Sequence, residues 1–430
     1  MTNMKCAFSQ VDITPPTDLG IFQDGYGSRT KPATGVRDPI YAKICIFETP
    51  EGRFVIVSVD CCGFNHRMAQ RIRASLCGLC HLEEKELALC ATHTHAGPVG
   101  GVLGLLPING YYWNDVIYKI SEAILASQKE LKPCTLRFGL GKELEGIYNR
   151  RGKQDIDRRV KLGAFFDENN KLLGAITTAS CHAVCIGDMG FSADYPAILT
   201  KKAAELYPDA PFLFLQGRSG DVDPSDITPT NTVEIYNKLG EEFSASVLGA
   251  IEELKNKKSS LCGSRLKASF KISRLPLRRL DDQYHKERIE YSYRRLAVAD
   301  TPDKRRFKQV DLVWHSAELI RNKRDPEPSM EVNLQTLLLG DDAAFVFVPF
   351  EMLTKTGNAL EKILCSMGIA PEKAMVLAHS NGTNGYLAPS DEVSENTYET
   401  QSSSIWYDLP CCSEKTEREM ISHFEKMLKS

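Results

Sequence analysis

Residues 87–98 read LALCATHTHAGP, an apolar run followed by two histidines and a Gly-Pro pair. The run predicts a strand over Leu87–Thr92. Side chains two positions apart at a strand end point the same way, so His93 and His95 share a direction. The Gly-Pro pair then turns the chain away from the rings. Imidazole is the commonest protein ligand for zinc, and the chain has only nine histidines. We therefore interpret the stretch as a metal or catalytic site, with a hydrogen-bonded histidine pair as the alternative.

The composition narrows the class of protein. The 430 residues carry 53 Lys+Arg against 56 Asp+Glu, and 42% are hydrophobic, which argues against disorder and against a nucleic-acid partner. No stretch approaches the roughly 18 apolar residues of a membrane span, and residues 1–14 lack an apolar secretion signal. The fourteen cysteines are scattered without such a signal. We therefore expect a cytoplasmic protein with reduced thiols and no transmembrane segment.

Alternating strand and helix patterns predict an α/β or mixed α+β fold. Several strand runs are apolar at consecutive positions, which indicates sheets covered on both faces. Besides Leu87–Thr92, strands are expected at Tyr41–Phe47, Arg53–Asp60, Leu173–Ala179, Pro211–Leu215, Glu331–Leu339, Ala343–Val348 and Ala374–Ala378. Helices are expected near Met68–Leu76, Val116–Leu131, Ala197–Leu206, Val233–Leu254, Leu353–Met367 and Glu414–Leu428.

One segment differs from the rest of the chain. Leu280–Arg324 is dense in Arg and Lys and has local helical spacing, but acidic residues interleave with the basic ones. This mixture favours a solvated helical hairpin, inserted at about residues 280–325, over a surface for an acidic partner. Because there is no internal repeat and no linker, we expect residues 1–430 to form a single domain.

Other candidate site residues also follow predicted strands. His182 comes after the run Ile176–Ser180, and Glu351 comes just after Ala343–Val348. Each has an ordinary interpretation: a satisfied polar residue, or an acid in the first turn of a helix. Even so, Glu351 can face a cleft shared with His93 and His182.

Two further stretches remain ambiguous on their residues alone. Residues 381–386 read NGTNGY after another strand, which is typical both of tight turns and of sites. Asp194 can either orient an imidazole or cap the helix that begins near Pro196.

Several familiar patterns are rejected. Residues 215–224 read LQGRSGDVDP, which does not match the G-x-S-x-G nucleophile elbow around Ser219 and leaves the role of Arg218 open. Residues 77–81 match a haem-attachment pattern, whose chemistry occurs outside the cytosol. Cys181, His182 and Cys185 lack the second cysteine pair of a zinc finger. There is no Walker A pattern and no dinucleotide fingerprint.

Taken together, the motifs resemble the catalytic domain of the neutral/alkaline (non-lysosomal) ceramidase family. The resemblance rests on THTHAGP at 92–98, GDVDP at 220–224, PFE at 349–351 and the Asn381–Tyr386 stretch. Supporting matches in the same order are VDIT at 11–14, GY at 25–26, GVRDP at 35–39, VSVD at 57–60 and NR at 149–150. The resemblance implies two packed mixed β-sheets flanked by helices, and zinc-dependent hydrolysis of the amide of N-acyl sphingoid bases.

The resemblance also implies roles for individual residues. The zinc ligands would be His93, His182, Glu351 and Tyr386. His95 and Arg150 would lie near the scissile amide. Two neutral imidazoles, a carboxylate and a phenol oxygen leave room for a water on Zn²⁺, which can attack an amide carbon.

Three departures from the family shape the expected function. Gly217 stands where the family has a serine before the G-D-x-x-P stretch, no C-terminal sandwich domain is expected, and no export signal is seen. We therefore expect a cytosolic zinc hydrolase acting on an amide or ester of a small-molecule or lipid-like N-acyl substrate that is not necessarily ceramide. The alternatives are a non-catalytic binding protein that retains the fold, and an amidohydrolase-type barrel, which also uses an H-x-H pair.

Overall fold

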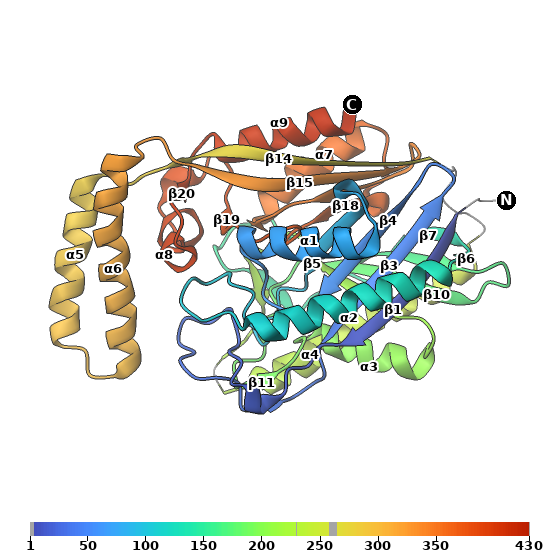
Figure 1. The fold of residues 1–430 in the computed structure, drawn as a ribbon, viewed down its shortest axis with the longest axis horizontal. Helices are drawn as coiled ribbons and strands as arrows, with labels where there is room; N and C mark the ends of the chain where they lie inside the picture. Colours follow the sequence, from blue (N-terminus) through green and yellow to red (C-terminus); the bar gives the residue numbers. More distant parts are fainter. Residues whose placement is uncertain (1–3, 229, 258–264, 430) are drawn as a thin grey trace.

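The computed structural model describes residues 4–228, 230–257 and 265–429, and these form a mixed α/β fold (Figure 1). The described residues contain three larger sheets rather than the two expected, together with three two-stranded sheets. The larger sheets pack around a shared apolar core, and helices cover their outer faces.

The first sheet carries the histidine pair at the end of an edge strand. Its order is β5 (Leu87–Ala91), β4 (Gly52–Val59), β3 (Tyr41–Thr49), β1 (Lys5–Asp12) and β6 (Lys132–Pro133). Helices α1 (His66–Cys80) and α2 (Gly110–Lys129) pack on its outer face. Along β3, Ile44 and Ile46 face these helices while Cys45 and Phe47 face the shared core. Burial of both faces explains why the predicted strand is apolar at consecutive positions.

The second and third sheets repeat this arrangement. The second has the order β12 (Phe212–Gln216), β10 (Leu172–Ala179), β9 (Lys161–Phe166) and β7 (Thr135–Leu140), covered by α3 (Pro196–Leu206) and α4 (Thr232–Lys255). The third has the order β18 (Ala374–Leu377), β16 (Ala343–Phe347), β15 (Ser329–Leu339), β14 (Leu266–Arg278) and β20 (Cys411–Cys412), covered by α7 (Thr354–Ser366) and α9 (Thr416–Lys429).

The carboxyl ends of the edge strands meet at one place. The pairs β4–β5, β10–β12 and β16–β18 are each parallel. The Ala91 N–H donates to His379 O at 3.0 Å, and the Ala378 N–H donates to Gln216 O at 2.9 Å, which ties the three ends together. In open α/β sheets, ligands bind outside the carboxyl ends of strands, and the candidate site lies there.

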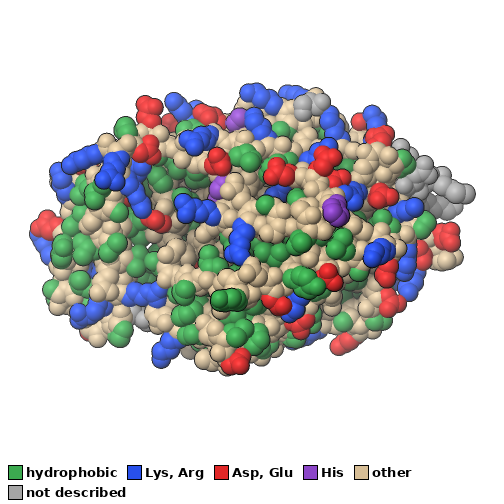
Figure 2. Space-filling model, in the orientation of Figure 1, with side chains coloured by type: hydrophobic (Ala, Val, Ile, Leu, Met, Phe, Trp, Pro, Cys, Tyr) green, Lys and Arg blue, Asp and Glu red, His purple; other side chains and the backbone are tan. Residues whose placement is uncertain are grey.

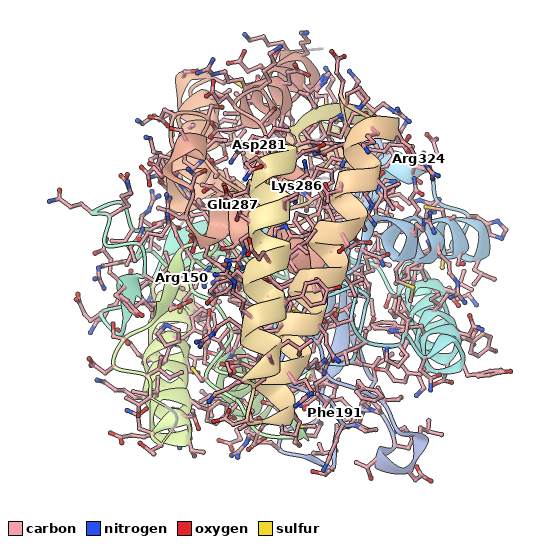
Figure 3. The ribbon with its side chains drawn as sticks, turned by 90° about the vertical axis from the view of Figure 1, so that its left-hand side faces the viewer. Arg150, Phe191, Asp281, Lys286, Glu287 and Arg324 are labelled. Atoms are coloured by element: carbon pink, nitrogen blue, oxygen red, sulfur yellow. The ribbon has the colours of Figure 1, made fainter. Side chains whose placement is uncertain are left out.

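The charged insertion forms the expected helical hairpin, α5 (Asp282–Ala297) and α6 (Pro302–Arg324), at one end of the molecule (Figure 1). Figure 3 looks onto the two helices, which run side by side. Figure 2 shows basic side chains over this end with acidic ones among them. Arg306 donates to Arg29 O at 2.9 Å, and Arg321 pairs with Asp408 at 2.7 Å. The hairpin therefore braces two segments near the site.

All eight expected strands and all six expected helices are present, with small shifts at their ends. The amidohydrolase barrel is wrong, because the larger sheets of the described chain are open and have edges. Among the described residues, no helix is long and apolar enough to span a bilayer. The single domain over residues 1–430 and the cytoplasmic location stay predictions.

Candidate metal centre

His93 lies directly after β5 in a left-handed backbone conformation, with φ of 63°. This conformation turns its fully buried ring so that Nδ1 lies 2.6 Å from Cys62 O. Because a carbonyl oxygen only accepts, Nδ1 carries the proton and donates it. The other ring nitrogen, Nε2, is therefore left without a proton.

His182 reaches the same state from the second sheet. Its Nδ1 lies 3.3 Å from Val222 O and 3.5 Å from Asp223 Oδ1, so Nδ1 again carries the proton. Its Nε2 lies 3.3 Å from Glu351 Oε2, and His93 Nε2 lies 3.4 Å from the same oxygen. Two unprotonated nitrogens thus face one carboxylate oxygen.

Glu351 is ionised in this setting. Burial alone would raise the pKa of its carboxyl, but positive charge on the side of His93 and His182 outweighs burial and holds the pKa well below its usual range. With both Nε2 atoms unprotonated, a bound cation would supply this charge. The ligand atoms of these three residues lie within 4.8 Å of one another, and all three side chains are buried. Three lone pairs that face each other repel unless a cation lies between them. Two imidazoles and a carboxylate are a donor set that zinc uses, so these residues fit the expected ion.

Tyr386 lies beside Glu351 because β17 (Glu351–Met352) pairs in parallel with β19 (Tyr386–Leu387). Burial raises the pKa of the Tyr386 phenol well above its usual value, and Arg150 works against this. The Arg150 Nη2 donates to Tyr386 Oη at 3.0 Å. The structure thus brings together all four expected ligand residues, with Arg150 behind the phenol.

His95 lies next to His93, with 3.3 Å between their Nε2 atoms. Its Nδ1 is buried without a hydrogen-bond partner among the described residues. Burial holds the pKa of His95 well below its usual value, so the ring is neutral. The ring is packed against Gly25, where an added Cβ would come within 2.4 Å of it. Gly25 is therefore required for His95 to occupy this place.

Two residues of the centre were missed by the sequence analysis. The Tyr407 hydroxyl donates to Glu351 Oε1, so the other carboxylate oxygen faces the histidines. His379 stacks on His93, with ring centroids 3.8 Å apart and planes 16° apart. His379 follows β18 just as His93 follows β5, and this position after a strand could have identified His379 from the sequence. Tyr407 lies far along the chain, and no sequence pattern pointed to it.

A cavity of about 560 Å³ opens beside the centre. His95, His182, Arg150, Asp223 and Tyr386 line one part of it. The remaining lining is partly aromatic and partly hydroxylated, and includes Tyr26, Ser28, Val184, Ile227, Thr228 and Tyr398. The volume falls within the range of small-ligand pockets.

Two other candidates, Arg218 and Asp194, lie outside the group of ligands. Arg218 forms buried ion pairs with Glu361 at 2.7 Å and Asp157 at 3.2 Å, away from the centre. The Asp194 carboxylate accepts from its own helix start at Tyr195 N and from the Ile186 N–H at 2.8 Å, which fixes the loop after His182. The Asp194 carboxylate therefore fixes the backbone of this loop and of the helix start. No contact of Asp194 with an imidazole is seen in the described residues.

Position 217 has no room for the serine of the family. A Cβ added to Gly217 would lie 2.6 Å from Ser180 Oγ and 2.9 Å from Ala179 O.

Cys62 could replace a ligand, since it forms a second possible group with His93 and His95. Burial raises the pKa of this thiol well above its usual value, which disfavours the thiolate that metals bind.

Comparisons with known proteins show that the first part of the chain is similar in sequence to ceramidases and that nearly the whole chain is similar to them in fold. Residues 6–185 match the family model described as neutral/alkaline non-lysosomal ceramidase, N-terminal. The chain is 26% identical over 204 residues to the neutral ceramidase of Pseudomonas aeruginosa, and 26% identical over 198 residues to neutral ceramidase 2 of Arabidopsis thaliana. These alignments cover 42% and 40% of this chain, but only 30% and 26% of the relatives.

Solved structures extend the likeness of fold to nearly the whole chain. The crystal structure of neutral ceramidase from P. aeruginosa superposes with a TM-score of 0.77 at 18% identity, covering 99% of this chain and 74% of that one. A ceramidase complexed with C2 gives a TM-score of 0.75 at 17% identity, covering 99% and 75%. The expected resemblance is therefore confirmed, by sequence over residues 6–185 and by fold over the rest.

Proposed function

We propose that this chain is a zinc-dependent hydrolase that cleaves an amide, or a chemically related ester, of an N-acyl substrate. The observation that carries the proposal is the approach of two unprotonated Nε2 atoms, of His93 and His182, to Glu351 Oε2. We assign these three residues and Tyr386 as the ligands. The names of the relatives support an amide as the bond that is cleaved.

A bound zinc ion acts as a Lewis acid and lowers the pKa of a coordinated water to about 7. The protein residues supply the remaining functions. His95 is neutral, and its Nε2 lies 3.3 Å from that of His93, so it can accept or return a proton beside the ligands. Tyr407 holds one oxygen of Glu351, which leaves the other for the ion.

Arg150 acts by holding the wall of the cavity. Its guanidinium donates to Tyr386 Oη and to Gly220 O, both at 3.0 Å, and to Glu399 at 2.9 Å. Because four of its five N–H groups are engaged when the Asp223 contact is included, we assign Arg150 to positioning Tyr386 and favouring its phenolate.

Hydrolysis of a panel of N-acyl amides and esters tests this proposal. We expect turnover by zinc-loaded protein, its loss with chelator, and its return with added zinc. His95→Ala should retain zinc and lose most of the turnover, whereas the control His66→Ala, at a partly buried histidine paired with Glu331, should retain both. If the zinc-loaded protein cleaves neither class of bond, the non-catalytic binding protein becomes the better interpretation.

A further inference from the structure

We propose that Asp223 makes this site selective for substrates whose amine half carries a positive charge, such as a primary ammonium group a few bonds from the amide nitrogen. The part of this inference that says such a substrate is cleaved rests on the proposed hydrolase function. The part that says the substrate is positively charged rests on the residues that line the cavity.

Asp223 is the carboxylate that faces the cavity. Three acids surround the group formed by Arg150 and His182. The side chains of Glu351 and Glu399 are 2% and 4% exposed, whereas that of Asp223 is 19% exposed. Among the described residues that line the cavity, Asp223 alone is acidic. A ligand in the cavity therefore meets this carboxylate.

The contacts of Asp223 within the protein are long. Its Oδ1 lies 3.3 Å from Arg150 Nη1 and 3.5 Å from His182 Nδ1. Charge-assisted hydrogen bonds are usually about 2.7–2.9 Å long, and a carboxylate can accept about four of them. In the described part of the chain, no closer donor to this carboxylate is seen. The group can thus accept a further donor from a ligand.

The charges around Asp223 also leave an excess of negative charge. One guanidinium, that of Arg150, faces two carboxylates, Glu399 at 2.9 Å and Asp223 at 3.3 Å. The next cation, Arg151, stands 3.7 Å from Glu399 but is engaged at 2.5 Å by Glu392. A carboxylate removed from water without a full partner is costly, and a cationic ligand group removes this cost.

The position of Asp223 sets where the charge would lie in the substrate. Its carboxylate meets His182 at Nδ1, across the ring from the Nε2 that faces Glu351. A group bound by Asp223 is therefore separated from the reacting bond by about the width of one imidazole. The neighbouring lining includes Ile227 and Tyr398, which suit a short apolar link between amide and cation.

Calorimetric titration of metal-free protein tests the selectivity without turnover. The probes are N-(2-aminoethyl)octanamide and N-propyloctanamide, which differ by an ammonium group in place of a methyl group. We expect wild type to bind the ammonium ligand about 10-fold more tightly or better. Asp223→Asn, which keeps the shape, should abolish the preference, and Asp223→Ser should do the same. Asp188→Asn is the matched control, because Asp188 adjoins the cavity at Gly187 but is paired with Arg37 at 2.5 Å.

Equal binding of the two probes by wild type would overturn the inference. A preference for the ammonium ligand that survives in Asp223→Asn would also overturn it, as would the absence of binding at probe concentrations up to the solubility limit. The same probes given to zinc-loaded protein separate the two proposals. Selective binding without hydrolysis would contradict the hydrolase function and support Asp223 as the selector. Hydrolysis of both probes at the same rate, with equal binding, would overturn the selectivity alone.

Discussion

Two regions of this molecule bury histidines beside a carboxylate, and they satisfy these groups differently. In the hairpin, His285 Nδ1 and His315 Nδ1 lie 2.8 Å apart, so the proton of one ring bonds the bare nitrogen of the other. The nearby acid, Asp311, is paired with Arg288 at 2.9 Å and accepts from Ser292. The facing Nδ1 atoms and the carboxylate are satisfied within the protein there, although the Nε2 atoms of both rings are buried without a hydrogen bond. Among the described residues, no group of three possible ligand atoms is seen in the hairpin.

At the metal centre the balance is different. The Nδ1 protons of His93 and His182 are directed to backbone carbonyls, and no Lys or Arg among the described residues pairs with Glu351. The nitrogens and the carboxylate oxygen that remain are all acceptors. The comparison teaches that a buried group of histidines indicates a metal only where its acceptors outnumber its donors.

The largest expected effect comes from removing one acceptor at the centre. His93→Ala should abolish zinc retention and lower hydrolysis by more than about 100-fold, because even residues that only support metal ligands cost 10–100-fold when lost. Elemental analysis and an N-acyl amide assay measure the two effects. The matched control is His285→Ala, which removes a buried histidine from the hairpin and should keep the zinc. A His93→Ala variant that is active without metal would contradict the assignment of His93 as a metal ligand.

A smaller effect is expected from Tyr407→Phe. This change removes the donor to Glu351 Oε1 and should weaken zinc affinity by about 10-fold, measured by chelator competition. Tyr398→Phe is the control, because it keeps the ring that packs on Tyr386 and leaves the Tyr407 bond in place. Equal zinc affinity in the two variants would mean that the Tyr407 hydroxyl does not support the metal ligands.

The hairpin should respond in stability rather than in metal content. Asp311→Asn weakens the bonds to Arg288 and Ser292 and should lower the free energy of unfolding by about 1–3 kcal/mol. Urea denaturation measures the change, and elemental analysis should find the wild-type amount of zinc. A loss of zinc in this variant would mean that the two regions are not separate in function.

The smallest effect is the part of the pH dependence that the hairpin contributes, in addition to that of buried His95 at the centre. Burial and the neighbouring His315 lower the pKa of His285 below 6.5, its value in the unfolded chain. The unfolded chain therefore binds the proton more readily, and the stability of the metal-free protein should fall as the pH drops below about 6.5. Urea titrations at about pH 7.5 and about pH 5.5 measure this fall, which should shrink in His285→Gln. An unchanged fall in that variant would assign it to other groups.

The sequence located most strands but not how they pair. Burial on both faces made β5 and β16, and most of β3 and β4, runs of consecutive apolar residues, which are easy to recognise. Strand β14 alternates exposed and buried residues and contains Pro276, which hid it. Without β14 the third sheet could not be recognised, because strand order depends on contacts between distant segments.

The candidate site was predictable where chemistry follows a strand directly. His93, His182 and Glu351 each come within a few residues of a predicted strand, and the structure brings them together. Asp223 and Tyr407 lie in β13 (Val222–Pro224) and α8 (Ser404–Tyr407), which are too short for a local pattern to reveal them. Asp223 was visible only as part of the GDVDP stretch.

The measurement that tests the account most directly is the zinc content of protein purified without chelator. We compare wild type with Glu351→Gln and with the exposed control Glu331→Gln. We predict about one zinc per chain in wild type and in Glu331→Gln, and its loss in Glu351→Gln. No zinc in wild type even after zinc is added back, or equal zinc in all three proteins, would contradict the proposed centre.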